Sequence, residues 1–140
     1  MKTELEHKVL EKIRRLLTDD LAVKNYVDGR VYTEHISLIK NPRYPAISLY
    51  LMPDQARTNV PDMVNMLIQI DLWFPVKDWT EEEVLSCYER VKALIDRQDL
   101  SDKGLNLVVV QIFETGVAGM MYDRYIQGHH LPAHYAVVAK

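Results

Sequence analysis

Three of the five histidines in this 140-residue chain lie close together, at His129, His130 and His134. Histidine is the commonest metal ligand in proteins. Two histidines four residues apart form a ligand pair when a helix returns them to one face. Here Pro132 separates His130 from His134, and no His-Glu-x-x-His helper carboxylate is present. We therefore expect a loop over residues 128–132 with histidines at a turn and a strand end. The alternative is a small metal- or ligand-binding protein or enzyme that uses these histidines with Asp123.

Other reactive side chains carry weaker signals. Cys87 falls within an amphipathic helical pattern, where a half-buried structural role is expected. The acidic triplet Glu81, Glu82 and Glu83 suits the first turn of a helix and needs no metal to explain it. The five glycines form no phosphate-binding loop, and neither Ser48 nor Ser86 has a histidine nearby in sequence. We predict no catalytic residues, no metal site and no cofactor.

One short segment combines charges with aromatic side chains. Asp123 and Arg124 stand between Tyr122 and Tyr125. This arrangement suits a binding pocket, and it equally suits a strand edge at a subunit contact. Both interpretations stay open at this stage.

Composition limits the possible classes of protein. The chain is 48% apolar and 26% charged, which is typical of a globular protein, and its length predicts a single domain over residues 1–140. The net charge of −3 and the small basic cluster of Lys12, Arg14 and Arg15 disfavour sequence-specific nucleic-acid binding. The start of the chain lacks the apolar run of a signal peptide, and no stretch is apolar enough to span a membrane. With its single cysteine, the protein is expected to be made in the cytoplasm.

The hydrophobic pattern predicts two helices. The first covers residues 3–17 with Thr3 as N-cap, and the second follows Thr80, which forms a capping box with Glu83. Residues 28–29 signal a turn, residues 33–44 read as a loop or a distorted strand, and residues 54–62 suggest a hairpin-type connection.

Period-two patterns predict strands between and after these helices. They cover residues 46–52, 64–74, 105–115 and 133–139, with short extended pieces at 30–32 and 120–125. In the 64–74 strand the even-numbered residues form one apolar face, while Asp71 on the other face is expected to be solvated or to line an assembly. Residues 107–110 are apolar on both faces, which suggests an interior strand or a strand that meets a partner chain.

The order of these elements is helix, strand, strand, helix, strand, strand. It predicts an α+β fold with an antiparallel or mixed sheet of about four strands and two helices packed on one face.

Several short motifs occur in a familiar order. Asp28-Gly29-Arg30-Val31-Tyr32 follows the first helix, then comes Tyr44-Pro45-Ala46-Ile47-Ser48-Leu49, then a strand that ends in Asp71-Leu72-Trp73. Asp123 precedes the last strand. Over residues 5–139 this order resembles the tail-completion or tail-terminator proteins of long-tailed bacteriophages and prophages.

The resemblance implies a structural protein that is incorporated into the virion tail. Its partners would be other copies of itself in a ring, commonly a hexamer, together with the tail tube and head-completion proteins. It implies no enzyme activity and no cofactor. It assigns no residue to the surface that meets the tube or the head.

Overall fold

The computed structural model describes residues 3–52 and 63–140. The helices are α1 (Glu4–Asp19), α2 (Leu21–Val27) and α3 (Glu81–Ile95), with short 3₁₀ helices η1 (Ile36–Leu38) and η2 (Lys103–Leu105). The strands are β1 (Val31–Tyr32), β2 (Ala46–Leu51), β3 (Val64–Pro75), β4 (Val109–Val117), β5 (Met121–Asp123) and β6 (Gly128–Ala139). The predicted α+β class is confirmed. Within the described residues the sheet has six strands instead of about four, and α2 is a third α-helix.

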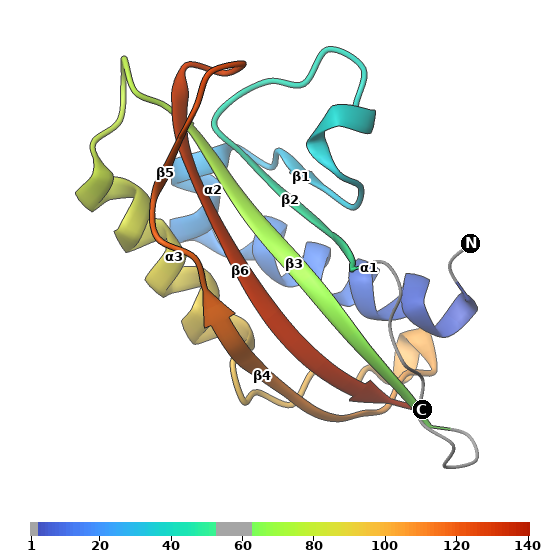
Figure 1. The fold of residues 1–140 in the computed structure, drawn as a ribbon. Coiled ribbons are helices and arrows are strands. Elements are labelled where there is room, and N and C mark those ends of the chain that lie inside the picture. The colour runs from blue at the N-terminus through green and yellow to red at the C-terminus, as the bar shows by residue number, and fades with distance from the viewer. Residues whose placement is uncertain (1–2, 53–62) are drawn as a thin grey trace.

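The strands form one mixed sheet in the order β1-β2-β3-β6-β4, and β5 also pairs with β6. The β1–β2 pair is parallel and the remaining pairs are antiparallel. β3 and β6 are paired along their whole lengths, from Val64 opposite Ala139 to Pro75 opposite Gly128. All three α-helices lie on one side of this sheet, and we call the opposite side the helix-free face (Figure 1).

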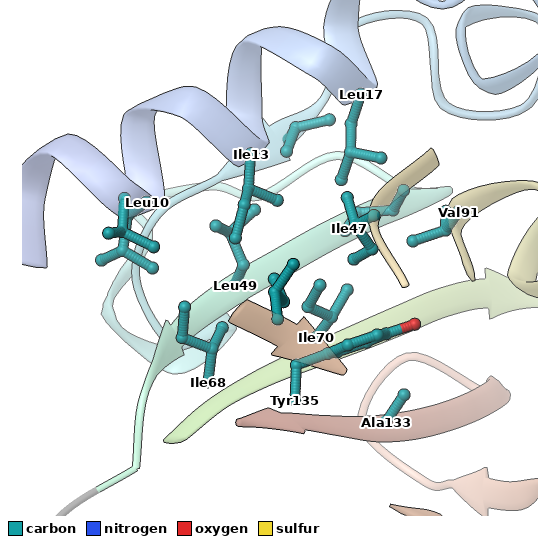
Figure 2. Close-up of a cluster of buried hydrophobic side chains, with 14 of the residues drawn as sticks. Leu10, Ile13, Leu17, Ile47, Leu49, Ile68, Ile70, Val91, Ala133 and Tyr135 are labelled. Carbon is teal, nitrogen blue, oxygen red and sulfur yellow. The ribbon is translucent and has the colours of Figure 1, made fainter. Parts of the chain in front are cut away.

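The core lies between the helices and the sheet. Figure 2 shows Leu10, Ile13 and Leu17 of α1 directed at side chains from the sheet, among them Ile47 and Ile70, and all of these are buried. The predicted apolar face of β3 is confirmed, because its even-numbered residues from Met66 to Phe74 belong to this core. Apolar burial of this kind is the main favourable term in folding.

The predicted helix starts are also confirmed. The Thr3 hydroxyl accepts a hydrogen bond from Glu6 N–H at 3.2 Å. At α3, Thr80 and Glu83 form both halves of the capping box.

The short helix α2 was not predicted, because seven residues are too few for a clear helical period. Its start nevertheless carries an ordinary signal. Asp20 caps it by accepting a hydrogen bond from Val23 N–H at 3.1 Å, and Arg90 of α3 donates to the same carboxylate. Asp20 therefore fixes the α1–α2 corner against α3.

Several loop and strand predictions need correction. Residues 33–44 form a loop that contains η1, so the loop interpretation is confirmed and the distorted-strand alternative is wrong. β4 ends the sheet order, so the prediction that it is an interior strand is wrong; its Val108–Val110 region still exposes Val108 and Val110 while burying Val109. The predicted connection at 54–62 lies outside the described residues.

The loop predicted at 128–132 is wrong, since β6 begins at Gly128 and runs through Pro132. Proline is tolerated in a strand only where its missing N–H is not needed. The Pro132 carbonyl accepts from Ala118 N–H at 3.0 Å, so the backbone of Pro132 faces away from β3. There it lies in the gap between the part of β6 that pairs with β4 and the part that pairs with β5.

Cys87 is fully buried on α3, deeper than the half-buried position expected for it. Burial raises the pKa of its thiol to about 12. The group is therefore a protonated, inert part of the core at neutral pH.

Candidate functional site

The helix-free face carries the main concentration of polar side chains in the sheet. Asp71, predicted to be solvated or to line an assembly, is fully buried there with an exposed fraction of 0%, so the solvated interpretation is wrong. It lies on β3 opposite Ser48 of β2 and Pro132 of β6. We call the connected side chains around it the polar network, which consists of Ser48, Gln69, Asp71, Trp73, His130 and His134.

The hydrogen bonds of the polar network converge on the Asp71 carboxylate. Gln69 Nε2 donates to Asp71 Oδ1 at 2.8 Å, and His130 Nε2 lies 2.9 Å from the same oxygen. His134 Nε2 lies 3.1 Å from Gln69 Oε1. Since a carboxylate and an amide oxygen only accept, both histidines carry a proton on Nε2.

A second part of the polar network is aromatic. The Trp73 and His130 rings stack with centroids 3.8 Å apart and an interplanar angle of 8°. The Trp73 indole N–H donates to Ser48 Oγ at 2.9 Å. Burial, and then the nearby negative charge of Asp71, raise the pKa of the Tyr50 hydroxyl above its ordinary value. These contacts join β2, β3 and β6 on the side opposite the three α-helices, where Ile36 of the 3₁₀ helix η1 packs against Ala46 and Trp73.

The three clustered histidines do not converge. Alternate residues of a strand point to opposite faces, and Leu131, Ala133 and Tyr135 of β6 belong to the core on the helix side. His129 shares that side, and its Nε2 donates to the Trp79 carbonyl at 3.0 Å. His130 and His134 share the helix-free face. Among the residues that the structure describes, no group of three or more His, Cys, Asp or Glu side chains is placed to hold a metal ion.

The polar network contains an Asp–His pair but no exposed nucleophile beside it. Ser48 is fully buried, and its oxygen is occupied by the indole N–H of Trp73. General base catalysis needs a proton donor within hydrogen-bonding reach of the base and room for a substrate. What the arrangement does is hydrogen-bond Asp71 Oδ1, Ser48 and the two histidines across three paired strands. Asp71 Oδ2 is buried without a hydrogen-bond partner among the described residues.

The charged and aromatic segment 122–125 forms the end of the β5–β6 hairpin. Asp123 Oδ1 accepts from the N–H groups of Tyr125 at 2.9 Å and Ile126 at 3.2 Å, so this carboxylate shapes the turn. Tyr125 is 100% exposed and Tyr122 is 63% exposed. Both rings therefore project from the fold into solvent.

The outer edge of β4 is covered by the segment that follows α3. Three backbone groups of β4 on this edge are hydrogen-bonded by residues 96–101. The bonds run from Arg97 N–H to the Ile112 carbonyl at 2.9 Å, from Glu114 N–H to Asp96 Oδ1 at 2.8 Å, and from Val109 N–H to Ser101 Oγ at 3.0 Å. An edge strand with its polar groups used in this way offers few positions for pairing with another strand.

The basic cluster on α1 is paired with acidic side chains. Arg14 and Arg15 both donate to Glu11, at distances from 2.6 to 3.0 Å. Lys12 forms an ion pair with Asp102 at 3.1 Å. No helix in residues 3–52 and 63–140 is both long and apolar enough to cross a membrane.

Sequence reasoning missed the polar network as a unit. The available signal was that β3 and β6 both carry polar residues at period two on their non-core face. These are Gln69 and Asp71 on β3, and His130 and His134 on β6. The pairing register that joins them cannot be read from either strand alone.

Comparisons with known proteins give a likeness of fold. No protein-family model matches the chain, and no curated protein sequence matches it. A chain in a solved structure titled as the virion of a native gene transfer agent (GTA) particle is similar over 99% of this chain and 98% of its own length. The TM-score is 0.73 and the sequence identity 10%. A second solved structure, whose name states no function, covers 94% of both chains with a TM-score of 0.55 and 16% identity.

Proposed function

We propose that this protein is a structural subunit of a phage or prophage tail, and that it forms the terminator ring at the junction between tail and head. The observation that carries the proposal is the likeness of fold, along almost the whole chain, to a component of the gene transfer agent virion. The order of sequence motifs, which resembles tail-completion proteins, points the same way. The partners would be further copies of the chain, the tail tube and the head-completion proteins.

The proposed role needs no reaction, cofactor or metal. The polar side chains that were the best candidates for chemistry have structural partners: His129 bonds to Trp79, His130 to Asp71 and His134 to Gln69. We propose that the site contains no catalytic or metal-binding residue, and that the protein is made in the cytoplasm and built into the tail. Replacing His130 and His134 by alanine should leave the metal content of tag-free protein unchanged.

The direct test is binding to tail tubes. Tubes assembled from the tail-tube protein encoded beside this gene are mixed with the purified chain and sedimented. The chain should co-sediment, and negative-stain images should show a ring at one tube end only. Binding along the whole tube, or no binding at all, would contradict the proposal, as would a gene neighbourhood without tail-tube and tape-measure genes.

A further inference from the structure

An open pocket of about 740 Å³ lies beside β4, between its residues 109–113 and the segment 97–101. This volume is within the range of roughly 300–1,000 Å³ that is usual for binding pockets. Its origin is local. The segment is fastened to β4 at Ile112 by Arg97 N–H and at Val109 by Ser101 Oγ. Between these two points a register shift in the β4–β6 pairing leaves Val110 as an extra residue, and a bulge of this kind bends the strand beside the pocket.

The lining of this pocket combines an apolar wall with two opposite charges. Val110, which is 49% exposed, and Phe113 supply apolar surface. Arg97 and Asp99 stand on the other wall. The backbone N–H of Ser101 donates to Asp99 and lowers the pKa of its carboxyl, so Asp99 is anionic at neutral pH.

The β5–β6 hairpin carries the complementary chemistry. Its tip presents Tyr125 and Tyr122 to solvent, with Arg124 and Asp123 between them. The turn is held from inside, because Asp123 accepts two backbone N–H groups and the Gln127 carbonyl accepts from Val76 N–H at 3.1 Å. A preorganised loop loses little entropy on binding, and tyrosine and arginine are residue types enriched at interface hot spots.

We propose that the hairpin tip of one copy of this chain docks into the pocket of the next copy. Tyr125 would cover the apolar wall at Val110, Arg124 would face Asp99, and Asp123 would face Arg97. The occupant is a second copy of the chain because both halves of the contact, and both signs of charge, are present on one molecule. This contact deepens the ring proposed above and rests on it.

The position of the two halves gives the contact a direction. Figure 1 places the hairpin turn at one end of the sheet and the start of β4 at the opposite end. A contact between different patches of identical chains is heterologous, and it closes into a ring or continues as a filament. A reciprocal two-fold dimer would also satisfy both patches, so a product that stops at the dimer would contradict the ring.

A disulfide test detects the contact even when it is transient. A Tyr125→Cys, Val110→Cys variant is oxidised at high protein concentration and run on a non-reducing gel. Cys87 needs no replacement because it is fully buried. We expect a ladder of chain multiples, and no ladder from the matched control Tyr125→Cys, Lys24→Cys, whose second cysteine lies on exposed α2. No ladder from the first variant, or equal ladders from both, overturns the inference.

Charge reversal tests the pairing itself. Arg124→Asp and Asp99→Arg should each weaken association about tenfold or more, which corresponds to about 1.4 kcal/mol, and an equimolar mixture of the two variants should recover part of the loss. Arg43→Asp, at an exposed position on another loop, is the control. Sedimentation velocity provides the measurement. If both single variants assemble like the unmodified chain, the contact is wrong while the ring proposal stands. If the contact is found but tail tubes are not bound, the proposed function is wrong while the contact stands.

Discussion

Asp71 shows how one side chain can organise a sheet from its centre. It is an ionisable group with no exposed surface, and Gln69 and His130 both donate to its Oδ1, while its Oδ2 is buried without a hydrogen-bond partner among the described residues. Buried polar groups are tolerated when they are hydrogen-bonded and costly when a partner is removed. The polar network therefore depends on the carboxylate more than on either donor.

Asp71→Ala should lower the free energy of unfolding by about 1–3 kcal/mol or more, because two buried donors lose their acceptor. Urea denaturation followed by fluorescence measures this change. Asp78→Ala, at an exposed position before α3, should change the free energy by less than about 0.5 kcal/mol. Equal effects of the two substitutions would argue against a structural role of the network.

Tyr135 differs from Asp71 in that its one polar side-chain atom makes no hydrogen bond to any described residue. It is fully buried in the core, and its hydroxyl has no hydrogen-bond partner among the described residues. Burial is the main cause that raises its pKa. Tyr135→Phe should therefore leave stability unchanged or increase it by about 1 kcal/mol, since an unsatisfied hydroxyl is removed while the ring is retained. A clear loss of stability in urea denaturation would show that the hydroxyl has a partner.

At the scale of elements, the helix ends were the most predictable part of the fold. Thr3 and Thr80 both cap helices as the sequence indicates, because capping is local and depends on residues three apart. Strand β3 was equally predictable, because its even-numbered residues are apolar and form one face of the strand. β6 was shortened to 133–139 because Pro132 reads as a breaker, and only the neighbouring strands show that its missing N–H faces a gap.

The capping box at α3 gives a prediction for this scale. Thr80→Ala removes the acceptor of Glu83 N–H and should cost about 0.5–2 kcal/mol. Thr18→Ala, near the end of α1, removes a hydroxyl that caps no helix start and is the matched control. Thermal unfolding monitored by circular dichroism compares the two, and a smaller loss for Thr80→Ala than for Thr18→Ala would count against this account.

Helix α1 carries a pH-dependent contact. The hydrogen bond from Arg14, followed by that from Arg15, lowers the pKa of Glu11 from 4.5 to about 2 against the opposing effect of burial. A carboxyl with a lowered pKa in the folded state stabilises the protein above its unfolded pKa and loses that contribution as the pH falls. Glu11→Gln should therefore be less stable than the unmodified chain at pH 7, with the difference shrinking between about pH 4.5 and pH 2. Denaturation curves at several pH values test this prediction. A stability difference between the two proteins that grows as the pH falls would contradict it.

At the scale of the whole molecule, the sequence predicted the α+β class and the packing of helices on a single face of the sheet, but not the third α-helix or the strand order. Residues 107–110 are apolar on both faces, so β4 was expected either inside the sheet or against a partner chain. It lies at the edge of the sheet. Residues 96–101, whose sequence shows no strand-like alternation, supply its outer hydrogen bonds in place of a neighbouring strand. The predictions for Asp71 and for the histidine loop were wrong for the same reason, because strand register and strand order depend on contacts between segments that are distant in the sequence.

The single domain proposed for residues 1–140 should unfold in one step. A core that joins α1, α3 and the central strands makes their unfolding cooperative. Fluorescence of Trp73 and Trp79 and far-ultraviolet circular dichroism should give coincident urea transitions, measured below the concentration at which copies associate. Two separated transitions would divide the chain into independent units.

The fastening of β4 by residues 96–101, which precede it in the chain, has a consequence for handling the protein. Amyloid fibrils grow when further chains pair with the free backbone N–H and C=O groups of an exposed edge strand. On the outer edge of β4, backbone groups of Val109, Ile112 and Glu114 are already hydrogen-bonded by Ser101, Arg97 and Asp96. Concentrated stocks should consequently remain clear and fail to bind thioflavin T on storage, whereas an Asp96→Ala, Ser101→Ala double variant should form fibrils sooner.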